Sequence, residues 1–289
     1  DGNRFQIYDS TTETASEINH GSCDLNDENI KFVDSLSSKP TFIFLTSGKV
    51  RTYDSTSQKC DVSNSNDYPN SSSLGDPLFP DARFYGYAEG SSLRCWFLGT
   101  KDLGARVECF NGNSLVFTTT RLDDGYRRNN DHTGGDIFFG SDDYLYVANG
   151  DTDPGNLKEG RQQNLGFNAG KLIKFDPTFT GSNVEGTIHS VGFRNPWTTA
   201  KSEADRFVGQ VGQQTCETVY TLDTTTNQNF GWPKYEGRFF RSAVTPYKRD
   251  YADAGRVFTD SYRSSLPANF MFVLYILFFL LFVIGIGFV

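Results

Sequence analysis

Residues 132–151, "HTGGDIFFGSDDYLYVANGD", predict a β-hairpin. Two apolar and aromatic runs, Asp136–Phe139 and Tyr144–Ala148, enclose the turn-forming residues Gly140–Asp143. Gly, Ser and Asp are typical of tight turns because they tolerate or stabilise the backbone angles that a turn needs. The two adjacent acids of that turn, Asp142 and Asp143, are expected at the hairpin tip and not at a metal site.

His132 precedes the first strand of this hairpin, and Asp151 follows the second. A hairpin returns the chain to the end from which it started, so both side chains are expected at one edge of the sheet. Gly134 and Gly135 admit the close approach of a ligand or of another backbone segment. Simpler roles are also open: His132 as a turn residue that donates to a carbonyl, and Asp151 as the cap of an Asx-turn.

Strand signals dominate the chain outside the hairpin. Short β-branched and aromatic runs alternate with Gly, Asn, Asp and Ser clusters, and no long stretch has helical periodicity. Residues 41–54, "TFIFLTSGKVRTYD", predict two strands around a Ser-Gly turn. Further strands are expected in "GKLIKFD", "GTIHSVGF", "DRFVGQVG" and "ETVYTLD". The fold class is therefore all-β, either a sandwich or a propeller.

Composition bounds the size and the partners of the fold. The 289 residues, 37% of them hydrophobic, suffice for one large core. The formal net charge is -8, and we find no cluster of Lys and Arg that would bind phosphates. We therefore do not expect a nucleic-acid partner.

The cysteines predict disulfide bonds, because no CxxC pair supports a zinc or thioredoxin-type site. The segment between Cys95 and Cys109 is short enough to fold back on itself, so these two are expected to pair. Cys23 and Cys60 bracket the first strand-like region and form the second expected pair, which leaves Cys216. Asn70-Ser71-Ser72 is an N-glycosylation sequon in a Ser/Asn-rich loop.

The end of the chain predicts membrane attachment. Residues 270–289, "FMFVLYILFFLLFVIGIGFV", form an uninterrupted apolar run that matches the length of a membrane-spanning helix. A GPI-attachment signal with Asp253–Gly255 as its small-residue site is the alternative. The expected organisation is a β-domain over 1–240, a linker over 241–268 and a transmembrane helix or GPI tail over 269–289. The β-domain is expected on the extracellular or luminal side, and the chain then begins after a cleaved signal peptide or is incomplete.

The remaining chemistry-bearing residues are few. "GFRNP" puts Arg194 and Asn195 on a Pro-fixed turn, where a guanidinium fork and an amide suit carboxylates or quinone oxygens. His189 lies in a strand-like alternation and is expected to be structural. Trp197 and Trp232 are expected to be packing residues.

A series of motifs in a fixed order resembles the soluble quinoprotein glucose/sorbosone dehydrogenase family, which includes hedgehog-interacting-protein-like ectodomains. The motifs lie between His132 and Gly237. They are "HTGGDIFFGSDDYLYVANGD", "QQNLGFNAGKLIKFDP", "GFRNPW", "GQVGQQTCETVYTLD" and "NQNFGWPKYEG". The resemblance implies a six-bladed β-propeller that binds pyrroloquinoline quinone (PQQ) and calcium at one rim.

The resemblance also implies a role for six residues. His132 takes the place of the general base that accepts the proton of the sugar hydroxyl, and Asp151 that of the acid that orients it. Arg194 and Asn195 align with residues that contact the quinone. Gly212 and Gln213 align with residues whose backbone carbonyls hold calcium, a hard cation that prefers oxygen ligands.

The chain departs from the family pattern after Gly237, where the Lys and Arg side chains that grip the cofactor have no counterparts. The final blades of the propeller are therefore expected to be replaced by other structure, to come from elsewhere, or to be missing because the chain is a truncated reading of a longer protein. The first functional hypothesis is PQQ-dependent oxidation of an aldose sugar or sugar alcohol by a membrane-anchored protein. The alternative is a non-catalytic hedgehog-interacting-like ectodomain that binds a protein or a glycan, and a third is a structural surface protein with no rim ligand.

Overall fold

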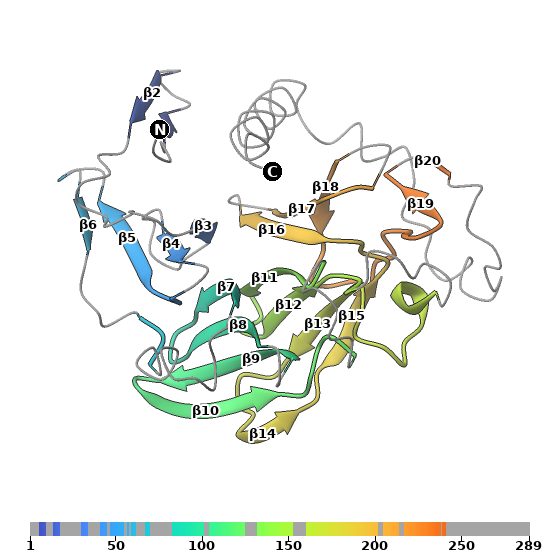
Figure 1. The fold of residues 1–289 in the computed structure, drawn as a ribbon, viewed down its shortest axis with the longest axis horizontal. Helices are drawn as coiled ribbons and strands as arrows, with labels where there is room; N and C mark the ends of the chain where they lie inside the picture. Colours follow the sequence, from blue (N-terminus) through green and yellow to red (C-terminus); the bar gives the residue numbers. More distant parts are fainter. Residues whose placement is uncertain are drawn as a thin grey trace.

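The computed structural model describes an all-β chain (Figure 1). The described residues are 6–9, 14–17, 30–33, 41–44, 47–54, 57, 59–61, 67–69, 83–100, 104–124, 132–152, 160–201, 205–213, 217–237 and 239–240. Within these ranges, the single helical element is the 3-10 turn η4 (Arg161–Gln163). The predicted all-β class is confirmed.

Two of the described sheets are antiparallel meanders of consecutive strands, one formed early in the chain and one late. The first has the strand order β3-β4-β5-β6, with β3 (Ile30–Val33), β4 (Thr41–Phe44), β5 (Val50–Asp54) and β6 (Lys59–Asp61). The three-stranded one has the order β16-β17-β18, with β16 (Pro196–Lys201), β17 (Arg206–Gln210) and β18 (Thr218–Leu222).

The two sheets between them are the best packed. One has the order β14-β10-β9-β8-β7, with β7 (Arg83–Glu89), β8 (Arg94–Thr100), β9 (Gly104–Asn111), β10 (Ser114–Thr119) and β14 (Gly181–Val184). The other has the order β11-β12-β13-β15, with β11 (Gly134–Phe139), β12 (Leu145–Asn149), β13 (Lys171–Phe175) and β15 (Thr187–Val191). Two short hairpins complete the list, β1 (Gln6–Asp9) with β2 (Thr14–Glu17) and β19 (Tyr235–Glu236) with β20 (Phe239–Phe240).

Apolar cores lie between neighbouring sheets, so the four sheets stack face to face. β12 shows the reason: Leu145 and Val147 belong to the core between the β7–β10 sheet and its own. Tyr146 and Ala148 alternate with them and belong to the core shared with β17 and β18. A third core joins the β3–β6 sheet to the β7–β10 sheet. Since successive side chains point to opposite faces, a strand buried on both sides reads as a continuous apolar run.

The first strands of successive sheets lie together. β11 packs against both β7 and β16, and β3 contacts β7 and β16. Asp136 of β11 ties two of these strands, because its Oδ2 accepts hydrogen bonds from Thr199 N (2.7 Å) and Thr199 Oγ1 (3.1 Å). From β7 to β10 the strands follow one another from the middle of the molecule to its outer edge (Figure 1). Sheets that radiate from a shared set of first strands are the arrangement of a β-propeller.

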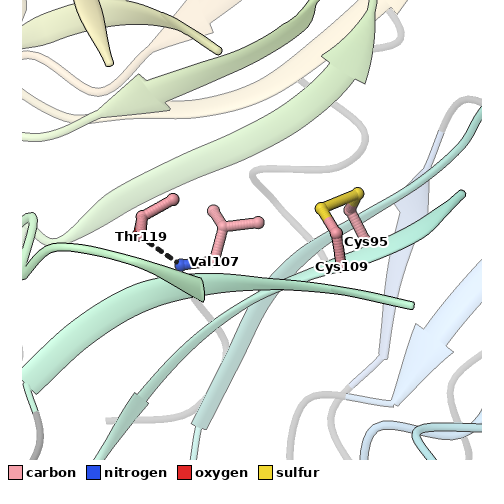
Figure 2. The surroundings of a disulfide bond; sticks show 4 residues. All are labelled: Cys95, Val107, Cys109 and Thr119. Atoms are coloured by element: carbon pink, nitrogen blue, oxygen red, sulfur yellow. Dashed lines mark hydrogen bonds between the residues drawn. A yellow bond between two sulfur atoms is a disulfide. The ribbon is translucent and has the colours of Figure 1, made fainter. Parts of the chain in front are cut away.

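The predicted Cys95–Cys109 disulfide is confirmed. It joins paired residues of the neighbouring strands β8 and β9, with a Cα–Cα distance of 4.1 Å. Beside it, Val107 N donates to Thr119 Oγ1 at 3.0 Å, at the end of β10 that follows the register shift between Leu115 and Phe117 (Figure 2). Cys60 is also disulfide-bonded, while Cys23 and Cys216 lie outside the described residues.

The structure tests several of the sequence predictions. The 132–151 hairpin forms with its tip at Gly140–Asp143, and the two strands of residues 41–54 pair as β4 and β5. His189 is buried, with its ring nitrogens against Ser190 Oγ and Thr224 O, as a structural histidine would be. Asn70, the linker 241–268 and the apolar tail 269–289 lie outside the described residues. Among the residues that are described, no helix is long and apolar enough to cross a membrane.

Candidate functional site

The loops that carry the candidate residues meet at one end of the sheets, because the sheets β11-β12-β13-β15 and β16-β17-β18 are antiparallel throughout. Every second connection in such a sheet returns to the same edge. The register confirms this geometry, since one row of paired residues crosses each sheet at that edge. The rows are Gly134–Asn149–Lys171–Val191 and Pro196–Gln210–Thr218. We call this edge the rim.

His132 lies at the rim between the carboxylate of Asp151 and the guanidinium of Arg194. Its Nδ1 is 2.9 Å from Asp151 Oδ1, and its Nε2 is 3.0 Å from Arg194 Nη2. A guanidinium can only donate hydrogen bonds and a carboxylate can only accept them. The imidazole is therefore the neutral tautomer that carries its proton on Nδ1 and presents the Nε2 lone pair to the arginine.

Asp151 is buried, with 2% of its surface exposed. Besides His132, it accepts hydrogen bonds on Oδ2 from Trp232 Nε1 at 2.9 Å and from Gln162 Nε2 at 3.4 Å. Burial raises the pKa of the Asp151 carboxyl, while the hydrogen bonds from His132 and Trp232 and the charge of Arg194 lower it. These donors compensate in part for the cost of placing a carboxylate away from water.

The backbone on both sides of this pair is strained. His132 has φ 57° and Thr152 has φ 58°, a left-handed region that a β-branched residue such as threonine rarely adopts. The two residues are bonded to one another, Thr152 N donating to His132 O at 3.1 Å. Strain of this kind persists only where surrounding contacts enforce it, and it concentrates at functional sites.

Two glycines allow the strands to approach closely here. A Cβ atom on Gly150 would lie 1.8 Å from His132 O, and one on Gly135 would lie 1.8 Å from Ala148 O. Both neighbours are backbone oxygens, Ala148 O in β12 and His132 O in the hydrogen bond from Thr152 N, so a side chain would have to displace the chain itself. The predicted need for glycine at position 135 is thus confirmed, and Gly150 has the same role at the other end of the pair.

Arg194 is held in place through its backbone and its side chain. Its N–H donates to Gln210 Oε1 (2.8 Å), its carbonyl accepts from Asp151 N (2.7 Å), and Nη1 donates to Val211 O (2.9 Å). Asn195 follows it on the turn into β16, and its carbonyl accepts from Val211 N at 2.9 Å. The structure therefore brings the predicted Arg194 directly against His132, with Asn195 beside it.

Gly212 and Gln213 lie on the next rim loop, after Val211. Their N–H groups donate to carboxylates, Gly212 to Glu217 Oε2 at 3.0 Å and Gln213 to Glu236 Oε1 at 2.5 Å. Burial raises the pKa of Glu217, the charge of Glu236 raises it further, and Arg194 lowers it. No group of three or more His, Cys, Asp or Glu side chains that suits a metal ion occurs in the described part of the chain.

Three residues at the site were not expected from the sequence. Gln162 reaches Asp151, and Trp232, expected only to pack, also donates to Asp151. Gln163 donates to Trp232 O at 2.8 Å. The motifs "GRQQNLG" and "NFGWP" mark these positions but not their contacts. The packing prediction was wrong for Trp197, which is 46% exposed on β16 between the buried Pro196 and the half-buried Thr198.

Lys171 anchors the rim loop that carries these glutamines. Its Nζ donates to Arg161 O and Ala169 O, both at 2.7 Å, and the side chain is fully buried. Burial lowers the pKa of Lys171 to about 7, although the charge of Asp124 acts in the opposite direction. A neutral amine can donate both bonds, so the fold favours the uncharged form.

We expect Lys171 to make stability rise with pH above neutrality. Its pKa is about 7 when folded and near 10.5 when unfolded, so between these values the unfolded chain binds more protons. The free energy of unfolding should then rise by up to about 1.4 kcal/mol per pH unit, and below pH 7 this contribution should be constant. Urea unfolding at pH 7, 8 and 9 measures the slope.

Lys171→Met should remove this slope, whatever its constant effect on stability. Lys174→Met is the matched control, because Lys174 is partly exposed and its bond to Asp142 raises its pKa. That control should keep the wild-type slope over this range. Equal slopes for the wild type and Lys171→Met would contradict the prediction.

Comparison with known proteins places this site in a family. A model of the glucose/sorbosone dehydrogenase family matches residues 109–273, more than half of the chain. The HIPL2 protein of Arabidopsis thaliana is 28% identical over 146 residues, 39% of this chain and 20% of that protein. The HIPL1 protein of the same plant is 31% identical over 138 residues, 37% of this chain and 19% of that protein. The matched stretch therefore spans about a fifth of these relatives.

A solved structure supports the same placement through its fold. The PQQ-bound form of aldose sugar dehydrogenase from Streptomyces coelicolor is similar with a TM-score of 0.50 and 17% identity, over 75% of this chain and 70% of that one. This similarity supports the β-propeller architecture inferred from the stacked sheets. Together with the family match over the rim motifs, it leads to one conclusion: the chain belongs to the glucose/sorbosone dehydrogenase family.

Proposed function

We propose that this protein is a PQQ-dependent dehydrogenase of an aldose sugar or sugar alcohol, built on a six-bladed propeller. The observation that carries the proposal is His132, held as the neutral Nδ1–H tautomer between the buried Asp151 and the guanidinium of Arg194. An imidazole that carries its proton on Nδ1 and an electron pair on Nε2 is suited to remove a proton from a hydroxyl group once the hydroxyl replaces Arg194 at Nε2.

In the proposed reaction, His132 Nε2 accepts the proton of the sugar hydroxyl at the carbon that loses hydride. The hydroxyl then takes the position in which Arg194 now donates to Nε2. Asp151 keeps the ring oriented through Nδ1–H and stabilises the imidazolium once it forms. The burial of Asp151 strengthens this effect, because charges interact more strongly away from water.

The residues at the rim fit an anionic quinone. PQQ carries carboxylates and quinone oxygens, and Arg194 and Asn195 would hold it; when bound it supplies the acceptor for the hydride. Hydrogen-bonding capacity is also left over at the rim. The buried atoms Thr152 Oγ1, Gln162 Oε1 and Asn195 Oδ1 have no hydrogen-bond partner in the part of the chain that is described.

We assign calcium, if the cofactor brings it, to the loop of Gly212 and Gln213. Both N–H groups are bonded to carboxylates, and the donors on offer at this loop are the backbone carbonyls and the oxygens of Glu217 and Glu236. Oxygen donors of this kind suit a hard cation.

A non-catalytic role on the same scaffold is the second candidate, with a protein or a glycan as ligand. The exposed Trp197 favours it, because this indole lies two residues after Asn195 and is 46% exposed. Indoles stack on sugar rings and are enriched in protein interfaces. The similarity to the plant HIPL proteins is compatible with this role.

Cofactor binding tests the proposed function. PQQ is titrated into the calcium-supplemented protein and followed by absorbance and calorimetry. Arg194→Lys should weaken binding about 10- to 100-fold, because a charge-assisted hydrogen bond in fixed geometry is lost. Arg94→Lys is the control. Arg94 lies on β8 and donates to Gly112 O in the turn between β9 and β10, at the end of the sheet opposite the rim, so its replacement should leave the affinity unchanged.

The outcome separates the two candidates. Saturable binding that weakens only in Arg194→Lys, followed by reduction of the bound quinone on addition of an aldose, supports the dehydrogenase. A folded wild-type protein that takes up no PQQ would overturn it, and glycan or protein ligands should then be screened against a Trp197→Ala variant.

We also propose that the protein is attached to a membrane through residues 269–289 and faces the extracellular or luminal side. The apolar composition of this tail and the disulfide between Cys95 and Cys109 support the proposal, because disulfides persist in oxidising compartments. Detergent partitioning of the full chain, with and without residues 269–289, tests it.

A further inference from the structure

Trp232 contacts both groups that hold His132. Its indole Nε1 donates to Asp151 Oδ2 at 2.9 Å, and its ring lies 5.6 Å from the Arg194 guanidinium. Asp151 and Arg194 are in turn the hydrogen-bond partners of the two imidazole nitrogens. One buried side chain from a different part of the chain thus contacts both neighbours of the ring.

The position of Trp232 is itself fixed by two clamps. The first is a reciprocal amide pair, in which Gln163 Nε2 donates to Asn229 Oδ1 (3.0 Å) and Asn229 Nδ2 donates to Gln163 Oε1 (2.7 Å). Gln163 Nε2 also donates to Trp232 O. The second clamp is the stack of Phe193 on Phe230, with ring centroids 4.2 Å apart.

The backbone joins these clamps to the site. Trp232 N donates to Gly192 O at 3.0 Å, and Phe230 N donates to Val191 O at 2.9 Å. Residues 229–232 therefore run along the segment that leads into Arg194. The amide pair and the stack of Phe193 and Phe230 thus hold the backbone that carries the indole.

The indole N–H has a defined electrostatic effect on Asp151. Burial raises the pKa of this carboxyl, and the hydrogen bond from Trp232 lowers it. Asp151 accepts from His132 Nδ1–H only as long as its oxygen is available and correctly oriented, and the bond on Oδ2 restricts rotation of the carboxylate.

We propose that Trp232 is a positioning residue for His132, which fixes the orientation of Asp151 through its indole N–H and that of Arg194 through its ring face. The inference rests on the proposed function, since it assigns the base of that reaction a third support. Trp232 acts through Asp151 and Arg194 and is therefore a positioning residue, not a catalytic one.

The test compares Trp232→Phe with Trp96→Phe in the cofactor-free protein. Both tryptophans are buried, but Trp96 Nε1 has no hydrogen-bond partner among the described residues, so its replacement removes packing alone. The first readout is carboxyl carbon NMR of Asp151 across pH. Trp232→Phe should raise the midpoint of its titration by about one to two pH units, and Trp96→Phe should leave it in place.

The second readout is nitrogen NMR of the His132 ring. Trp232→Phe should convert the single Nδ1–H tautomer into a mixture, because the acceptor for that proton is no longer held. Asn229→Ala, which breaks the amide pair and leaves the indole intact, should give the same change with smaller amplitude. It keeps the test informative if Trp232→Phe does not fold.

Kinetics of the PQQ-loaded protein give the third readout, with kcat expected to fall about 10- to 100-fold in Trp232→Phe and KM nearly unchanged. An unchanged Asp151 midpoint and a single His132 tautomer in both Trp232→Phe and Asn229→Ala would overturn the inference. If the wild type binds no PQQ but the NMR changes occur, the proposed function fails and the positioning role stands.

Discussion

His132→Gln is expected to lower the rate of sugar-dependent PQQ reduction by about 10²- to 10⁴-fold, the range that general-base catalysis contributes. Glutamine retains a side-chain amide that can hydrogen-bond Asp151 and Arg194, but it has no electron pair basic enough to take a proton. Binding of the quinone should therefore change little while turnover is lost. Steady-state dye reduction by the PQQ-loaded protein measures the effect.

His189→Gln is the matched control for this variant. His189 is the other described histidine, and it lies in the core against Ser190, Thr224 and the edge of the Tyr146 ring. Its replacement should affect stability and leave the turnover of folded protein unchanged. Equal turnover of His132→Gln and the wild type would show that another group takes the proton.

Gly150→Ala is expected to destabilise the protein by about 3 kcal/mol, at the upper end of the cost of overpacking. The new methyl would lie 1.8 Å from His132 O, 2.7 Å from His132 C and 2.9 Å from Gly134 N. All three are backbone atoms of residues 132–134 at the start of β11, so relief requires this segment to move away from residue 150 at the rim. Urea unfolding measures the loss, and NMR of His132 should show a displaced ring.

Gly166→Ala supplies the control on the neighbouring rim loop. Its nearest contact would be Asn164 Oδ1 at 3.3 Å, a side-chain atom that can move, and its φ is not positive. We expect a change within about 0.5 kcal/mol. A Gly150→Ala protein as stable as Gly166→Ala would mean that the rim adapts, and the close approach would then not be needed to hold His132.

Sequence patterns predicted much of the fold because they depend on local spacing. Alternating apolar residues around Gly140–Asp143 specify a hairpin whatever surrounds it, since the side-chain period of a strand is two. The hairpin in turn brings His132 and Asp151 to the same edge, and the structure places their side chains 2.9 Å apart. The Cys95–Cys109 pair follows the same logic, because these residues face one another across adjacent strands.

Contacts between distant segments came from the tertiary structure. Nothing in the local pattern of "NFGWP" indicates that Trp232 donates to Asp151, because the two are joined only through the stacking of separate sheets. The same holds for Lys171. Its place in a predicted strand does not indicate that its amine is buried between two carbonyls. Its lowered pKa is a consequence of burial.

By itself, the sequence determined the hairpin of residues 132–151 and the edge of the sheet that His132 and Asp151 share, because turns and strand alternation are local properties of the chain. The tertiary structure decided how the imidazole is held. Sheet stacking brings Arg194 to Nε2 of His132 and Trp232 to the far oxygen of Asp151. Packing between sheets depends on the shape and volume of many side chains together, and no single segment encodes it.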